Sequence, residues 1–193
     1  MKVALIPCGV TDWRQKGRLL GRVDLAFTPN GEAQCATWGE ELRPALLGRI
    51  FHAPDELSRA TAQRIGRRLN LPIKALDDLN EVDLGLWTGL TEGELKKRYA
   101  KAHRLLADSP LNVTPPEGES FSDAARRLRA CLKKHIKING KVGIGLVMRP
   151  FAFAMTRCVL EGRQPEELWE SSQREDQPIV MDCAGVPKSP AES

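Results

Sequence analysis

A cysteine follows the first predicted strand, at the point where the chain turns. Residues 2–6 (KVALI) form a short apolar run, and Pro7, Cys8 and Gly9 come directly after it. Groups at the carboxyl end of a strand in an α/β sheet commonly face a ligand. A thiolate in that place is a strong nucleophile, and Arg14, six residues further on, would lower the pKa of the thiol. Cys8 is therefore either a nucleophile or a residue that only occupies such a position.

A second group of candidate residues follows another apolar run. Residues 142–148 (VGIGLVM) are almost all apolar, which is typical of a strand buried on both faces, and Arg149 comes next. If this strand lies parallel to the first, Arg149 reaches the same edge of the sheet as Cys8. A planar guanidinium suits carboxylate or phosphate, so Arg14 and Arg149 are candidate anion-binding residues.

The elements that must position these residues alternate between strand and helix. Asp55 is placed to cap one helix, and Thr91 with Glu94 forms a capping box for another. This alternation predicts a largely parallel sheet covered by helices on both faces. The predicted strands are 2–6, 49–53, 71–76, 142–148 and 178–183; the predicted helices begin at Thr28–Pro29, 55–69, Thr91, 121–136 and Pro150, and 108–120 is a predicted loop.

Length and composition indicate one soluble domain. The chain has 193 residues, of which 41% are hydrophobic and 28% charged, an ordinary balance for a globular protein. No apolar stretch approaches the roughly 18–20 residues that cross a membrane, and no signal-peptide pattern follows the N-terminal run. We therefore expect a cytoplasmic protein with one domain over residues 1–183 and a disordered, Pro-rich tail over residues 184–193.

The metal-ligating and charged residues exclude several classes of function. Five cysteines occur without a CxxC pair and the three histidines are far apart, so we expect no disulfide framework, no metal site and no cofactor. The formal charge is +4. Acidic residues are interspersed with the basic clusters and no aromatic residues interleave with them, so we interpret these clusters as solvated helix faces rather than a nucleic-acid surface.

Five phrases in one order resemble the histidine phosphatase superfamily, which includes the cofactor-dependent phosphoglycerate mutases. The resemblance spans roughly residues 2–183 and implies a three-layer α/β/α sandwich with a mostly parallel sheet. The phrases are GRLLGRVDLAFTPNGEAQ (17–34), HAPDELSRATA (52–62), LNEVDLGLWTGLTEGEL (79–95), PPEGES (115–120) and VGIGLVMRPF (142–151).

The resemblance also implies where the catalytic residues of the family would lie. In the family, a histidine in an Arg-His-Gly motif becomes phosphohistidine, two arginines and a second histidine clamp the phosphoryl oxygens, and a carboxylic acid protonates the leaving oxygen. Of these groups the mapping keeps only the acid, Glu81. The corresponding positions are Pro7, Cys8 and Gly9 for the motif, Thr11 for the threonine after it, Leu57 for the second arginine, Glu81 for the acid and Arg149 for the second histidine.

Arg59 is an alternative for the second arginine, because it lies only two residues beyond Leu57. A shift of two positions on a helix turns a side chain to a different face. Thr61 and Ala62 match the Thr-Ala of the family only if Leu57 is the equivalent position. We therefore favour Leu57.

Three functions remain open from the sequence. The leading hypothesis is a pseudoenzyme that has lost phosphohistidine catalysis and acts as a binding module, with a phosphorylated or carboxylate small molecule or another protein as its partner. A second is a phosphatase with Cys8 as nucleophile and Glu81 as general acid, because the Cys-x5-Arg spacing of Cys8 and Arg14 resembles the phosphate loop of low-molecular-weight cysteine phosphatases. A third is a structural partner protein without a functional cleft. In the non-catalytic cases, we expect Glu81 to pair with Arg149 or Arg14.

Overall fold

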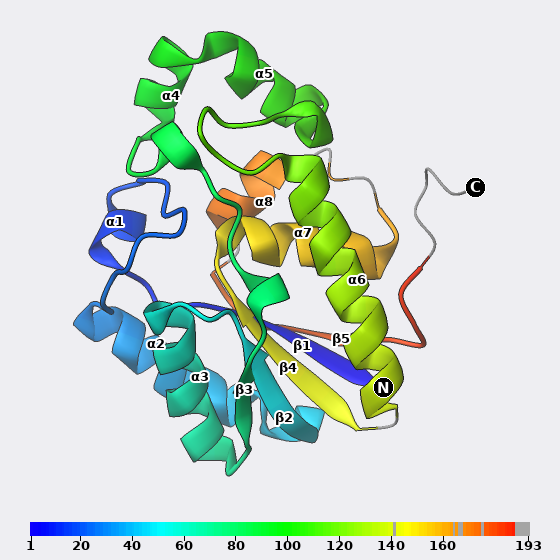
Figure 1. Ribbon diagram of the computed structural model, residues 1–193. Helices are drawn as coiled ribbons and strands as arrows, with labels where there is room; N and C mark the ends of the chain where they lie inside the picture. Colours follow the sequence, from blue (N-terminus) through cyan, green and yellow to red (C-terminus); the bar gives the residue numbers. More distant parts are fainter. Residues whose placement is uncertain (141, 164, 166–167, 175, 188–193) are drawn as a thin grey trace.

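Five strands form one sheet at the centre of the computed structural model (Figure 1), which describes all residues except 141, 164, 166–167, 175 and 188–193. The strand order is β3-β2-β4-β1-β5. The first four strands pair in parallel, and β5 runs antiparallel to β1 at one edge. The mostly parallel α/β sheet predicted from the sequence is confirmed. The strands are β1 (Lys2–Pro7), β2 (Leu47–His52), β3 (Ile73–Ala75), β4 (Gly143–Met148) and β5 (Ile179–Asp182).

Helices cover both faces of this sheet and create two hydrophobic cores. Alternate residues of a strand point to opposite faces, so Val3 and Leu5 join one core, and Ala4 and Ile6 join the other. The core with Ala4 and Ile6 lies under two helices, α2 (Pro29–Glu41) and α3 (Glu56–Leu69), and the core with Val3 and Leu5 lies under α6 (Phe121–Asn139) and α7 (Pro150–Glu161).

The remaining helices lie around the sandwich. α4 (Glu92–Arg98) and α5 (Ala100–Asp108) form a pair at the end of the molecule away from β2 and β3 (Figure 1). The short helix α1 (Asp12–Gln15) follows β1, and α8 (Leu168–Arg174) packs on α7. Neither α5 nor α8 was predicted from the sequence.

The local signals for helix starts are confirmed in detail. The Thr28 side chain accepts a hydrogen bond from the Gly31 amide, and Asp55 accepts one from Ser58. Both halves of the capping box of Thr91 and Glu94 are formed. These caps satisfy amides that have no partner within a helix. The Asp55 cap matters most for function, because it fixes this carboxylate near the carboxyl ends of β1 and β4.

The end of the chain differs in part from the predicted disordered tail. Val186 packs against the core, and the carbonyl oxygen of Pro187 accepts a hydrogen bond from Arg129. Residues 184–187 therefore lie against the domain. The rest of the predicted tail, 188–193, lies outside the described residues.

Candidate active site

A cavity of about 280 Å³ opens at the carboxyl ends of β1 and β4. Four of the residues singled out in the sequence line it: Pro7, Cys8, Gly9 and Arg14. Its other described lining residues are Val10, Gln15, Leu20, Asn30, Gln34, Met148, Pro150, Phe153, Gln173 and Asp176; Thr11, Leu57, Glu81 and Arg149 are not among the described residues that line it.

Gly9 allows the turn after β1 to approach α2 closely. A Cβ atom at this position would lie 2.6 Å from Cε1 of Phe27 and 2.8 Å from the carbonyl oxygen of Gly31. Either approach is too short for a side chain. The Gly9 amide donates to Oγ1 of Thr61 in α3, at 3.2 Å, which holds the turn over both helices and sets the position of Cys8.

The Cys8 thiol lies beside a carboxylate rather than in a cluster of cations. Its Sγ is 3.2 Å from Oγ of Ser58, and that hydroxyl donates to Oδ2 of Asp55 at 2.6 Å. Burial raises the pKa of Cys8 far above its ordinary value, and the charge of Asp55 raises it further. The hydrogen bond between Cys8 and Ser58 and the charge of Arg149 oppose this shift without cancelling it. Cys8 is therefore a protonated thiol at neutral pH, which is a poor nucleophile.

Arg149 forms an internal ion pair. Its side chain is fully buried, and both Nε and Nη2 donate to Oδ1 of Asp55, at 3.0 and 2.8 Å. Nη1 donates to the carbonyl oxygens of Gly21 and Val23, at 2.9 and 2.7 Å. The sequence predicted that Arg149 binds an external anion. In the structure Asp55 supplies a carboxylate to it, and the described lining of the cavity does not include the arginine, so binding of an external anion by Arg149 stays a prediction.

The packing of α3 supports the choice of Leu57 over Arg59 as the position nearer the site. Leu57 is 1% exposed, whereas Arg59 lies at the surface and pairs with Glu56. Leu57 is therefore a buried apolar side chain, and its correspondence to the second arginine of the family stays a prediction. Thr11, buried at the start of α1, accepts a hydrogen bond from the Arg14 amide at 3.2 Å and acts as a helix cap.

The carboxylate of Glu81 caps the start of α7. It is 2% exposed, and it accepts hydrogen bonds from the amides of Val82, Phe151 and Ala152 at 2.8–2.9 Å. Burial raises the pKa of Glu81, and these amides together with the charge of Arg149 oppose that shift. The predicted ion pair with Arg149 or Arg14 is not the contact that forms, because amides at the helix start already satisfy the carboxylate.

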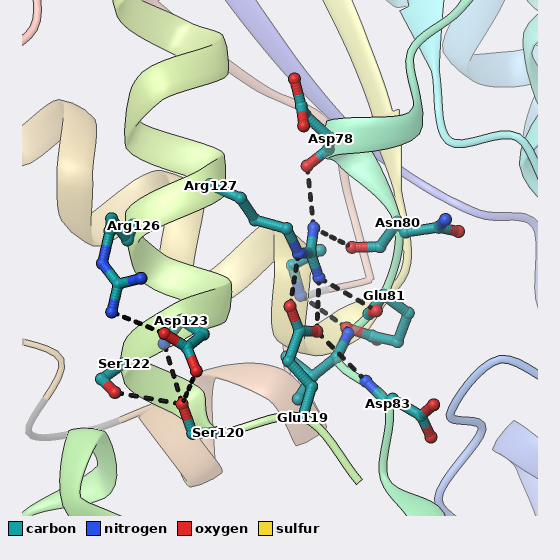
Figure 2. A network of polar contacts seen from close by, with 12 residues as sticks. Asp78, Asn80, Glu81, Asp83, Glu119, Ser120, Ser122, Asp123, Arg126 and Arg127 are labelled. Carbon is teal, nitrogen blue, oxygen red and sulfur yellow. Dashed lines mark hydrogen bonds and ion pairs between the residues drawn. The ribbon is translucent and has the colours of Figure 1, made fainter.

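The segment that carries Glu81 is fixed by one arginine of α6 (Figure 2). Arg127 donates to the carbonyl oxygens of Asp78, Asn80 and Glu81, and it forms an ion pair with Glu119 at 2.7 Å. Arg22 adds a second ion pair to Glu119, at 2.9 Å. This network holds the backbone before and after Glu81, so the position of its carboxylate depends on Arg127.

Arg14 lines the cavity and also holds the end of α8. Its Nη1 and Nη2 atoms donate to the carbonyl oxygens of Ser172 and Gln173, at 2.6 and 2.9 Å. A cation is favourable at a helix C-terminus, where carbonyls lack partners. Burial lowers the pKa of Arg14, and the charges of Asp176 and Glu81 oppose this. Anion binding by Arg14 stays a prediction, because two of its donors already have acceptors.

Three contributors to the site were not predicted: Ser58, the pairing of Asp55 with Arg149, and Asp176. The sequence marks Asp55 as a cap, but its ionic partner is 94 positions away. Within the part of the chain that the structure describes, no group of three or more His, Cys, Asp or Glu side chains could hold a metal ion. Among the same residues, no helix has the length and apolar character needed to cross a bilayer.

Comparisons with known proteins agree with this fold. The sequence model of the histidine phosphatase superfamily (branch 1) matches residues 3–182, so the chain belongs to this superfamily. It is 24% identical over 169 residues to phosphoserine phosphatase 1 of Hydrogenobacter thermophilus, covering 88% of this chain and 80% of that protein. It is 30% identical over 140 residues to the 2,3-bisphosphoglycerate-dependent phosphoglycerate mutase of Bartonella quintana, covering 70% and 68%.

A solved structure shows the same architecture. Bacillus stearothermophilus YhfR superposes with a TM-score of 0.83 at 19% identity, over 98% of this chain and 95% of that one. The predicted family and the phosphoglycerate mutase-like α/β fold are thereby confirmed.

The first prediction concerns the buried ion pair. Asp55→Ala leaves the Arg149 guanidinium buried without its counter-charge, so the free energy of unfolding should fall by about 3–5 kcal/mol in urea titrations. Asp12→Ala, which removes an exposed pair with Lys16, is the control and should cost about 0.5 kcal/mol or less. The double variant Asp55→Ala/Arg149→Met should recover part of the loss. A cost below about 1 kcal/mol for Asp55→Ala would contradict this role.

The second prediction concerns acid stability. Burial raises the pKa of Glu119, but Arg127 and Arg22 lower it more, so the net shift is downward. A lowered folded-state pKa stabilises the protein above the unfolded value of about 4.3, and this contribution is lost as the pH falls below it. Glu119→Gln should therefore cost about 1–3 kcal/mol at pH 7 and show a shallower loss of stability towards pH 3.

The control for this variant is Glu170→Gln, which affects an exposed pair with Arg174. Its acid unfolding curve should follow that of the wild type. If Glu119→Gln also retained the wild-type slope of unfolding free energy against pH, the Arg127 network would not be the source of the acid sensitivity.

The third prediction concerns the reactivity of Cys8. Its raised pKa leaves little thiolate at pH 8, so iodoacetamide should label it at least about tenfold more slowly than an unstructured cysteine peptide. Mass spectrometry of the wild type and Cys8→Ala identifies the modified residue, and labelling in denaturant supplies the unprotected rate. Rapid labelling of the native protein that disappears in Cys8→Ala would show that the thiol is activated.

Proposed function

We propose that this member of the histidine phosphatase superfamily has lost phosphohistidine catalysis and uses its cavity to bind a small molecule. The observation that carries the proposal is the position of the histidines. The chain has three, and none belongs to the described residues that line the cavity at β1 and β4. A phosphohistidine mechanism needs an imidazole at that place, where the chain has Cys8.

Each of the three histidines contacts other residues of the protein, away from the described lining of the cavity. His52, at the end of β2, is buried, with its Nδ1 atom 2.7 Å from the carbonyl oxygen of Ala53. His103 in α5 lies 3.2 Å from a carboxylate oxygen of Glu92. His135 in α6 packs its ring against Phe51. None of these settings supports nucleophilic attack on a ligand in the cavity.

The surroundings of Cys8 and Glu81 argue against a replacement cysteine mechanism. A cysteine phosphatase needs a thiolate, and burial with the nearby charge of Asp55 holds Cys8 in the thiol form. It also needs an acid that reaches the leaving oxygen. The carboxylate of Glu81 accepts hydrogen bonds from three amides outside the described cavity lining. This arrangement suits a cap of helix α7 better than a proton donor to a ligand.

The cavity still supports binding of a small molecule with a negative group. Relatives named as a phosphoserine phosphatase and a phosphoglycerate mutase act on small phosphorylated molecules. In this chain Arg14 is the arginine among the described lining residues, and guanidinium groups pair with either phosphate or carboxylate. A phosphorylated or carboxylate small molecule therefore remains the proposed ligand class, in preference to a protein partner.

The fourth prediction tests the loss of catalysis. An aryl phosphate such as p-nitrophenyl phosphate should show no turnover above background with the wild-type protein, and Cys8→Ala should be indistinguishable from it. Phosphoserine and 3-phosphoglycerate, assayed by phosphate release, should give the same result. Measured turnover that Cys8→Ala abolishes would overturn the proposal in favour of a cysteine phosphatase, and turnover that survives Cys8→Ala would overturn it in favour of another nucleophile.

A further inference from the structure

Two opposite charges line the same cavity without touching each other. Arg14 and Asp176 both belong to its lining, and no ion pair joins them among the described residues. Asp176 is exposed, and within that part of the chain it has neither a hydrogen bond nor an ion pair. The cavity therefore presents an unpaired carboxylate close enough to a guanidinium for their charges to interact.

Arg14 retains hydrogen-bonding capacity after it holds α8. A guanidinium has five N–H groups, and two atoms of Arg14 each donate to one backbone carbonyl, of Ser172 and Gln173. The Nε–H of Arg14 has no acceptor among the described residues, so the guanidinium can still receive a carboxylate. Because α8 fixes the side chain, little conformational entropy is lost when a ligand binds.

The interior of the cavity is apolar. Val10 and Pro150 belong to its lining and are partly exposed, and the other apolar lining side chains, Pro7, Leu20, Met148 and Phe153, are buried. Apart from Sδ of Met148, which already accepts from the Thr156 hydroxyl, these side chains have no donor or acceptor for a polar group, and the Cys8 thiol is uncharged. An occupant therefore needs an apolar body that contacts this floor, because a buried polar group without a partner is costly.

Carboxamides supply the remaining polar groups of the lining. They belong to Gln15, Asn30, Gln34 and Gln173. The Oε1 atom of Gln34 accepts from the Val10 amide, which leaves its NH2 group to donate. Carboxamides accept from an ammonium group and donate to a carboxylate, so they suit either end of a zwitterion.

We propose that this cavity binds a small zwitterion with an apolar body, namely an apolar α-amino acid. Its carboxylate pairs with Arg14, its ammonium group pairs with Asp176, and its side chain packs on Val10 and Pro150. This inference rests on the proposed function, since it takes the cavity to be a binding site and not a centre of phosphoryl transfer.

The charge balance separates this ligand from free phosphate. Arg14 and Asp176 together carry no net charge, and the floor at Pro7 and Cys8 adds none. A phosphate dianion would meet one guanidinium and would be repelled by Asp176, whereas a zwitterion is attracted at both ends. The preference of the cavity for an amino acid over phosphate should therefore depend on the ammonium group of the ligand as much as on its carboxylate.

The fifth prediction tests this with isothermal titration calorimetry on the full chain. L-leucine, L-methionine and L-valine are the probes, and at least one should bind. For the best probe, the N-acetyl derivative lacks the ammonium group and the carboxamide derivative lacks the carboxylate. Each derivative should bind at least about tenfold more weakly, which is the effect of losing a hydrogen-bonded charge. Inorganic phosphate should bind more weakly than the best amino acid.

Variants locate the two contacts. Asp176→Asn should lower the affinity for the amino acid about tenfold or more and should leave the affinity for its N-acetyl derivative unchanged. Asp182→Asn is the matched control, because Asp182 lies on β5 and its exposed carboxylate pairs with Lys2. This variant should leave the affinities for the amino acid and its derivatives unchanged. Arg14→Lys should weaken the amino acid and its N-acetyl derivative together, and thermal unfolding of this variant checks that α8 remains packed.

Three results would overturn the inference. One is that none of the three amino acids binds at a ligand concentration of about 10 mM. This concentration is well above the dissociation constant of about 1 mM that a marginal site would have. Another is phosphate binding tighter than every amino acid, which would leave the proposed function standing with an anion as ligand. The third is an amino acid affinity that Asp176→Asn does not change. Turnover of phosphate esters is a separate result and bears on the proposed function alone.

Discussion

The ion pair between Arg149 and Asp55 is the interaction on which the rest of the site depends. It joins the end of β4 to the first turn of α3, and the two carbonyl bonds from Arg149 add the loop at Gly21 and Val23. A guanidinium removed from water is stable only when its donors have partners and its charge is balanced. The pair therefore fixes three segments relative to one another beneath the cavity.

The same pair explains the chemistry of the turn after β1. Asp55 accepts from Ser58, and Ser58 contacts the Cys8 thiol, so one hydroxyl group connects that thiol to a negative charge. Phosphoryl transfer depends on positive charge directed at the equatorial oxygens. Here the buried arginine directs its donors at an internal carboxylate and at backbone carbonyls, and Leu57 adds an apolar side chain nearby. The chain thus combines the fold of the family with an internal ion pair beside the turn after β1.

Two backbone features hold the remaining polar groups in place. The amides at the start of α7 bind the carboxylate of Glu81, and Arg127 holds the segment that carries it (Figure 2). In the cavity lining, Arg14 holds the C-terminal end of α8, which carries Gln173, and Asp176 follows that helix. Segments near both ends of the chain therefore line the cavity. Its charged groups among the described residues are Arg14 from the first segment and Asp176 from the last.

The sequence by itself determined the family, the α/β class, the strands and the starts of α2, α3, α4, α6 and α7. The strands and helix starts depend on local apolar periodicity and on capping residues such as Thr28, Asp55 and Thr91. It also determined that no histidine follows β1. It did not show that Arg149 would pair with Asp55, nor that the Glu81 carboxylate would cap α7. Asp176 had no local signal either. Only the tertiary structure decided these roles, because the partner of a buried charge depends on which distant segments the fold brings within hydrogen-bonding distance.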